Sequence, residues 1–87
     1  MAEQSVQNAL GAAVRARREE LGLLQSECAR RAGVSVTSLS LIENGRKGAR
    51  FVTFWALASA LELEPAELAR RVGGMLLALG GGARSTS

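Results

Sequence analysis

The sequence predicts a single small domain of the all-α class. Its 87 residues are enough for one modest hydrophobic core. Aromatic residues make up only 3% of the chain and there is one proline, a composition that favours helices over a β-rich core. Within several segments, apolar residues recur at spacings of three and four, the periodicity of helices that bury one side. We therefore expect five helical segments.

The first expected helix runs from about Ser5 or Ala9 to Leu21. The polar start, Met1 to Gln4, is expected to be loose at its tip. Leu21-Gly22 is a plausible end, because glycine readily takes the left-handed conformation that closes a helix. Leu23 is expected to fill the core beyond it. The inner stripe of this helix has spacings of three and four: Val6, Leu10, Val14, Arg18 and Leu21.

Two short helices joined by a tight turn are expected over residues 25–45. Gly33 is placed to stop the first helix, Val34 to bury the turn and Ser35 to cap the second helix. Asn44-Gly45 is a C-terminal signal. Two helices around a glycine turn are typical of the helix-turn-helix of major-groove readers. Any corner of an all-α domain can show the same spacing, so both interpretations stay open here. The apolar positions of the two helices are Cys28, Ala29, Ala32, Leu39 and Ile42.

The second half of the chain is expected to form a basic loop, two more helices and a tail. The loop covers residues 46–50, and the fourth helix runs from about Val52 to Glu62. Pro65 suits the first turn of a fifth helix. Residues 80–87 look like a flexible tail. The inward positions of the fourth helix are Phe51, Phe54, Leu57, Ala58 and Leu61.

The domain organisation expected from these segments has three parts. Residues 1–9 form an N-terminal extension and residues 10–72 a DNA-binding domain. Residues 73–87 form a candidate dimerisation segment and the flexible tail.

Positive charge is concentrated in the half of the chain that carries the turn. The formal net charge is +3. Residues 1–50 hold eight basic and five acidic residues, whereas residues 51–87 hold three of each. This distribution is the one that a nucleic-acid footprint requires. For Arg30 and Arg31, an ordinary solvated helix surface is an equally good interpretation.

Several classes of function have no support in the sequence. The single cysteine, Cys28, excludes an internal disulfide and suits a core position on its helix. The chain has no histidine, no cysteine cluster and no glycine-rich phosphate loop after a strand, so we expect no enzyme activity, metal or cofactor. No apolar run approaches the ~18 residues of a membrane span, and no signal sequence opens the chain. We therefore expect a soluble, cytoplasmic protein without a membrane partner.

Residues from about Leu10 to Leu68 resemble the phage-repressor-like helix-turn-helix family, often called the Xre or Cro family. The resemblance implies a five-helix domain whose third helix enters the major groove. It also implies a salt bridge between Arg18 and Glu43. The sequence departs from the family pattern at Leu24, at Cys28 and in the loop after Arg46, which lacks the common proline. The residues that carry the resemblance are Arg18, Leu21-Gly22, Gln25, Ala29, Gly33-Val34-Ser35, residues 39–45 (LSLIENG), Ala58 and Leu61.

DNA contacts are assigned to two sets of residues. No Arg, Asn or Gln lies between Val34 and Glu43, so a larger share of specificity is expected from DNA shape or from the basic loop. For Val36 and Leu41, simple exposure or an interface is the alternative. The expected base contacts are Ser35, Val36, Thr37, Ser38 and Leu41. The expected phosphate contacts are Gln25, Asn44, Arg46, Lys47 and Arg50, with the role of Gln25 implied by the resemblance.

The expected partners are double-stranded DNA and a second copy of the chain. A helical stripe continues into the C-terminal segment, and we expect a homodimer through Met75, Leu76 and Leu79, joined by exposed parts of the fourth helix such as Trp55. The alternative is that this stripe folds onto the core of its own chain. A second hypothesis for function is an antitoxin-like or bridging module of the same fold that binds a protein partner.

Overall fold

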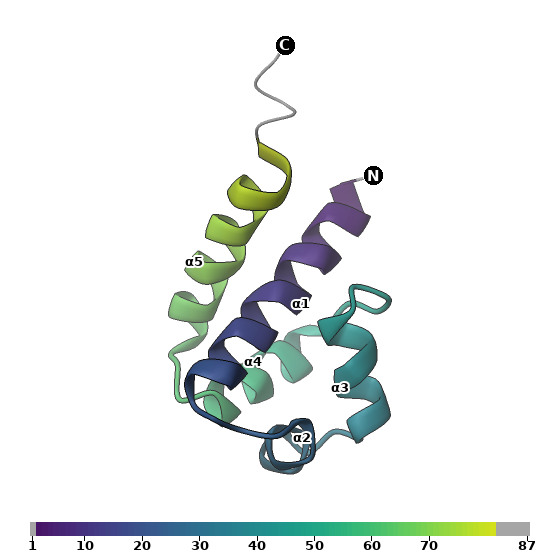
Figure 1. The fold of residues 1–87 in the computed structure, drawn as a ribbon, viewed down its shortest axis with the longest axis vertical. Coiled ribbons are helices and arrows are strands. Elements are labelled where there is room, and N and C mark those ends of the chain that lie inside the picture. The colour runs from purple at the N-terminus through teal and green to yellow at the C-terminus, as the bar shows by residue number, and fades with distance from the viewer. Residues whose placement is uncertain (1, 82–87) are drawn as a thin grey trace.

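The structure, a computed structural model, describes residues 2–81, which form five α-helices followed by a short π-helix (Figure 1). No strand occurs in this range, and the all-α, five-helix prediction is confirmed. The expected tail lies outside the described residues from position 82 onward, while Gly81 ends the π-helix. The elements are α1 (Ala2–Glu20), α2 (Gln25–Ala32), α3 (Val36–Glu43), α4 (Phe51–Ala60), α5 (Pro65–Leu76) and η1 (Leu77–Gly81).

The two longest helices, α1 and α5, lie side by side, and the three shorter helices lie together in the lower right part of the view (Figure 1). α3 packs on α1, and α2 packs on both α3 and α4. The core lies where these helices meet. Burial raises the pKa of the Cys28 thiol, which lies in this core. The largest fully buried side chains are Leu39, Ile42, Leu57, Leu61, Leu68, Val14 and Cys28.

The first helix begins earlier than predicted. It starts at Ala2 instead of Ser5 or Ala9, and it continues without a break past residue 9, where the N-terminal extension was expected to end. Val6 is 47% exposed, so its place on the inner stripe was wrong. The first turns do not reach the apolar core. They lie instead beside the loop after α3, where Gln4 Nε2 donates to the Gly45 carbonyl oxygen over 2.7 Å.

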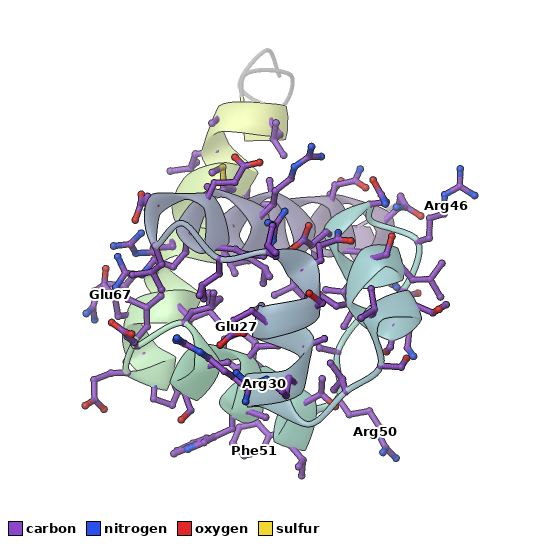
Figure 2. All side chains as sticks on the ribbon, turned by 60° about the horizontal axis from the view of Figure 1, so that its bottom comes forward. Glu27, Arg30, Arg46, Arg50, Phe51 and Glu67 are labelled. Atoms are coloured by element: carbon purple, nitrogen blue, oxygen red, sulfur yellow. The ribbon has the colours of Figure 1, made fainter. Side chains whose placement is uncertain are left out.

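Phe51 was predicted to face inward, and this was wrong. It opens α4, is 72% exposed and points away from the body of the domain (Figure 2). Its ring lies against that of Trp55, with 5.5 Å between centroids. The core side of α4 is filled by Leu57, Ala58 and Ala60, which lie farther along the helix than Phe51. Phe51 therefore covers the outer side of α4.

The fourth helix also ends earlier than expected. Its last residue is Ala60, and Glu62 takes a left-handed conformation with φ of 61°. A glutamate rarely takes the place that glycine usually holds after a helix, so no stop signal was visible in the sequence.

The turn between α2 and α3 has the local chemistry that was predicted. Gly33 has φ of 72°, and its N–H donates back to α2. The Ser35 hydroxyl oxygen accepts from the Ser38 backbone N–H over 3.0 Å and caps α3. Leu24 precedes α2 and supplies no side-chain cap, which is the consequence of its departure from the family pattern. The sharp corner depends on Gly33 and Ser35.

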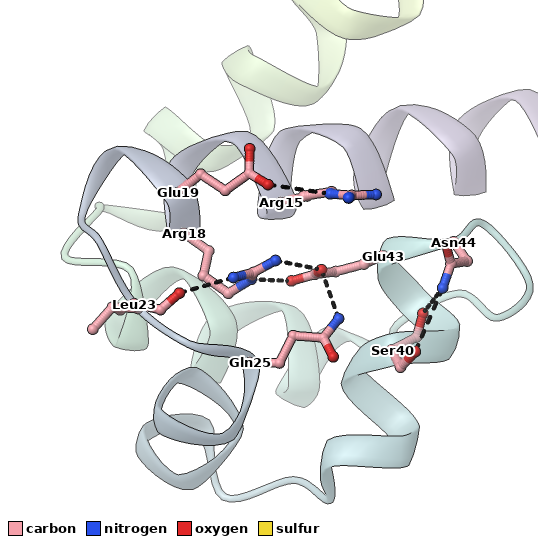
Figure 3. A network of polar contacts seen from close by, with 8 residues as sticks. All are labelled: Arg15, Arg18, Glu19, Leu23, Gln25, Ser40, Glu43 and Asn44. Atoms are coloured by element: carbon pink, nitrogen blue, oxygen red, sulfur yellow. Dashed lines mark hydrogen bonds and ion pairs between the residues drawn. The ribbon is translucent and has the colours of Figure 1, made fainter.

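A buried polar network joins α1, α2 and α3 (Figure 3). Arg18 forms a two-pronged pair with Glu43: its Nε lies 2.7 Å from Oε2 and its Nη2 lies 3.1 Å from Oε1. Arg18 Nη1 also donates to the Leu23 carbonyl oxygen, and Gln25 Nε2 donates to Glu43 Oε1 over 2.9 Å. The side chains of Arg18 and Glu43 are only 11% and 2% exposed. The hydrogen bond with Glu43 raises the pKa of Arg18.

The backbones of α1 and α3 meet at Gly11. A Cβ atom added at this glycine would overlap the Ile42 carbonyl oxygen and would lie 2.7 Å from the Glu43 carbonyl oxygen. Carbonyl oxygens of a helix cannot swing away as a flexible side chain can. The absence of a side chain at Gly11 therefore lets the end of α3 lie directly on α1.

We predict that Gly11→Ala lowers the free energy of unfolding by about 1–3 kcal/mol, because the added methyl group forces two backbones apart. Gly73→Ala is the matched control in α5, where an added Cβ meets no atom within 4 Å. It should raise stability by up to about 1 kcal/mol through helix propensity. Urea unfolding of both variants measures the contrast, and a Gly11→Ala chain at least as stable as wild type would contradict the close-packing argument.

We also predict that Arg18→Ala lowers the free energy of unfolding by about 3–5 kcal/mol, because Glu43 would stay buried without its partner. The matched control is Arg15→Ala on the same helix. Arg15 pairs with Glu19 at 3.3 Å, but both side chains are more than half exposed, so the loss should stay under about 1 kcal/mol. Thermal and urea unfolding provide the measurement. Equal stability of the two variants would show that the buried pair does not hold the domain together.

Candidate nucleic-acid interface

The third helix presents one buried and one exposed side. Leu39, Ile42 and Glu43 point into the domain. Val36, Thr37 and Leu41 lie on the exposed side, and the capping residue Ser35 is exposed as well. Figure 1 shows α3 at the edge of the domain, with no other element covering its outer side. An uncovered short helix with small polar and apolar side chains has the dimensions of a segment that enters the major groove.

The expected base contacts come together on the first turn of α3 and the turn after it. Thr37 and Val36 are exposed, and their methyl groups suit contact with a thymine methyl. The Ser35 oxygen is occupied by the cap, which leaves its hydroxyl hydrogen as the group that can be donated outward. Ser38 is half-buried on the flank of the helix and accepts a hydrogen bond from the basic loop. The structure therefore brings the expected base-contacting residues together on the first two turns of α3.

Within residues 2–81, the positive charge without an ion-pair partner lies in the loop after α3. Within residues 2–81, the arginines of α1, α2 and α5 all form ion pairs with glutamates. The three cations of the loop, Arg46, Lys47 and Arg50, take part in none of the ion pairs in the same range. Arg46 and Arg50 project away from the domain on the side where α3 lies (Figure 2). Cations without a carboxylate partner attract a polyanion more strongly than paired ones.

Two of the expected phosphate contacts have their amide groups engaged inside the domain. Gln25 donates to Glu43 in the buried network. Asn44 Nδ2 donates to the Ser40 carbonyl oxygen over 2.9 Å and folds back on its own helix (Figure 3). Both residues differ in this from Arg46 and Arg50, whose side chains project away from the domain (Figure 2). Phosphate contacts by Gln25 and Asn44 stay predictions.

Sequence reasoning missed the bond between the loop and the first turn of α3. Lys47 Nζ donates to the Ser38 hydroxyl oxygen over 2.9 Å. The residues are nine positions apart, a separation that no helical periodicity connects. Only the path of the loop, which turns at Gly45 with φ of 73°, brings them together.

The C-terminal segment divides its stripe between core and solvent. Met75 is half-buried against the core of its own chain and lines a shallow groove between α1 and α5. Leu76 is half-buried, whereas Leu79 is 60% exposed. Of the three residues expected at a dimer interface, Leu79 offers the most free surface.

Other kinds of site find no support in the described part of the chain. No group of three or more potential metal ligands occurs among residues 2–81. None of the helices in this range is both long enough and apolar enough to cross a membrane.

Comparison with known proteins gives a consistent result. Residues 14–68 match the family described as helix-turn-helix. A solved structure of the clp gene regulator ClgR from Corynebacterium glutamicum has 30% identity and a TM-score of 0.82, covering 93% of this chain and 85% of that one. A second structure of ClgR has 32% identity and a TM-score of 0.74, with coverage of 79% and 90%.

The restriction-modification controller protein C.AhdI from Aeromonas hydrophila is similar as well. Its structure has 31% identity and a TM-score of 0.69, covering 71% of this chain and 94% of that one. Among curated protein sequences, none matches the chain. The family match extends over more than half of the chain and includes α2, α3 and the basic loop. The chain therefore belongs to the Xre/Cro-type helix-turn-helix family of DNA-binding transcriptional regulators.

Proposed function

We propose that this protein regulates transcription by inserting α3 into the major groove of a specific DNA site. One observation carries the proposal: the exposed side of α3 adjoins the loop that holds the unpaired cations of the described chain. The helix that would contact the groove and the cations that would contact the backbone thus lie on one side of the molecule, as docking on a duplex requires. The similarity to the clp gene regulator ClgR and to the restriction-modification controller protein C.AhdI supports the same role. We place this activity in the cytoplasm.

The two sets of residues have different tasks in this proposal. Ser35, Val36, Thr37, Ser38 and Leu41 face base edges and supply hydroxyl donors and methyl groups. Arg46 and Arg50 lie along the sugar-phosphate backbone, where they neutralise phosphates and fix the orientation of the domain. Gln25 and Asn44 add backbone contacts near the ends of α2 and α3.

We further propose that the protein acts as a homodimer. A single helix-turn-helix domain reads few base pairs, and paired half-sites about one DNA turn apart supply the remaining affinity. The C-terminal segment provides the apolar surface through Leu79 and the exposed part of Leu76, with Met75 supporting them from the core.

A protein-binding role is the second candidate. It is favoured by an exposed apolar patch on α4, formed by Phe51, Val52 and Trp55. Apolar surface of this kind is typical of protein interfaces. An antitoxin-like or bridging module would use this patch as its principal contact, and its association would depend weakly on salt. A DNA reader loses affinity steeply as the salt concentration rises.

We predict that the protein selects a defined sequence from a random pool of duplex DNA. The combined change Thr37→Ala and Ser38→Ala should lower affinity for that sequence by about tenfold or more, because first-turn contacts are lost. Ser59→Ala, an exposed hydroxyl on α4, is the control and should leave affinity unchanged. Fluorescence anisotropy gives the affinities. No enrichment of any sequence would contradict the proposed function.

We predict a dimer at micromolar concentration in sedimentation experiments. Leu79→Asp should shift the population to monomer, because a charge would be buried in the interface. Leu24→Asp alters a leucine before α2 that is even more exposed than Leu79, and it should leave the dimer intact. A monomeric wild type, or a Leu79→Asp variant that dimerises as well as wild type, would exclude the proposed surface.

A further inference from the structure

Lys47 differs from the other two cations of its loop because its side chain is held in place. Its Nζ lies 2.9 Å from the Ser38 hydroxyl oxygen. Arg46 and Arg50 form no side-chain hydrogen bond with residues 2–81 and extend away from the domain (Figure 2). The ammonium group of Lys47 is therefore fixed beside the first turn of α3, whereas the two arginines reach outward.

The loop that carries Lys47 is anchored at several points. The Gly45 carbonyl oxygen accepts from Gln4 of α1, and the Arg46 backbone N–H donates to the Leu41 carbonyl oxygen over 2.9 Å. Gly48 passes close beside Gln7, so a Cβ added there would meet its amide nitrogen at 3.4 Å. These contacts fix the backbone before and after Lys47. Its side chain is thereby aimed back along α3 and not outward.

The position of Ser38 is held as well. Its backbone N–H donates to the Ser35 hydroxyl oxygen in the cap of α3. The Lys47–Ser38 bond thus ends on the capped first turn of α3, the part of a recognition helix that approaches base edges. No carboxylate within residues 2–81 forms an ion pair with Lys47. Of its three donor hydrogens, one points at Ser38 and two are available to DNA.

Lys47 provides a long side-chain donor, a kind of group that α3 itself lacks. Residues 36–43 contain no Arg, Lys, Asn or Gln, so the helix itself has no long donor for a base edge. In the major groove, guanine offers two adjacent acceptors, N7 and O6. An ammonium with two remaining donors beside the groove-facing turn matches this pair of acceptors.

We propose that Lys47 reads a guanine in the major groove and that Ser38 is the residue that positions it. The inference rests on the proposed function, because it requires α3 to lie in the groove. It gives Lys47 a part in sequence discrimination beyond the phosphate contact that its place in a basic loop suggests. The operator should accordingly contain a G·C pair next to the base pairs that face the first turn of α3.

The test measures the affinity of each protein variant for each of several DNA variants. Sites are selected with the wild-type protein, and each G·C pair of the selected site is then replaced by A·T. At one position, wild type should lose roughly five- to 150-fold in affinity, whereas Lys47→Ala should bind both DNAs alike. Arg46→Ala is the matched control, since it should weaken binding to both DNAs by the same factor and make the salt dependence shallower.

Ser38 is tested by the same pair of DNAs. Ser38→Ala should reduce the preference for the G·C pair without abolishing binding, because Lys47 remains but is no longer held. Ser38→Thr keeps the hydroxyl group and should retain the preference. A residue that only supported the helix would change affinity for both DNAs equally.

Three results would overturn the proposal. If Lys47→Ala weakens binding to every site by one factor, Lys47 is a phosphate contact. If no G·C position in the selected site depends on Lys47, the assigned base is wrong. If wild type selects no sequence at all, the proposed function fails and this inference fails with it. The first two results overturn only the inference, so the two failures are distinguishable.

Discussion

The buried pair between Arg18 and Glu43 is the interaction on which the position of α3 depends. It joins the end of α3 to α1, and Gln25 extends the same network to the start of α2. Burying two charges is costly unless the geometry is good and their remaining hydrogen-bonding groups are satisfied. Both conditions hold here, because Arg18 also donates to the Leu23 carbonyl oxygen. The direction of α3 relative to the rest of the domain is thus set by directed hydrogen bonds as well as by apolar contact.

Charge pairing explains how a protein with a modest net charge can attract a polyanion. Most arginines of α1, α2 and α5 have glutamate partners one helical turn away, and these exposed pairs contribute little to stability. Their effect is to cancel positive charge over most of the described surface. Among the cations of residues 2–81, those that remain unpaired, including Arg46 and Arg50, lie in the loop after α3. The distribution of charge therefore matters more for the mode of docking than its total.

The sequence predicted best what depends on neighbouring residues. Gly33 and Ser35 determine the corner between α2 and α3 by local backbone chemistry, so both were identified correctly. Glu62 was missed because it takes a conformation usually left to glycine. The start of α1, the outward direction of Phe51 and the Lys47–Ser38 bond depend on residues distant in the sequence, and periodicity carries no information about such contacts. The C-terminal stripe was visible, but its division between core and solvent was not.

The polar first turns of α1 connect these observations. Gln4 and Gln7 take no part in the apolar core, and they lie instead against Gly45 and Gly48 of the loop after α3. A loop of glycines and long cations would otherwise lose considerable conformational entropy on binding DNA. Contacts that order it beforehand reduce that cost. A recognition helix with short side chains can then share its reading of DNA with a loop, provided that the loop is held as firmly as the helix. In this domain α1 supports both: the loop through its first turns, and α3 through Gly11 and Arg18.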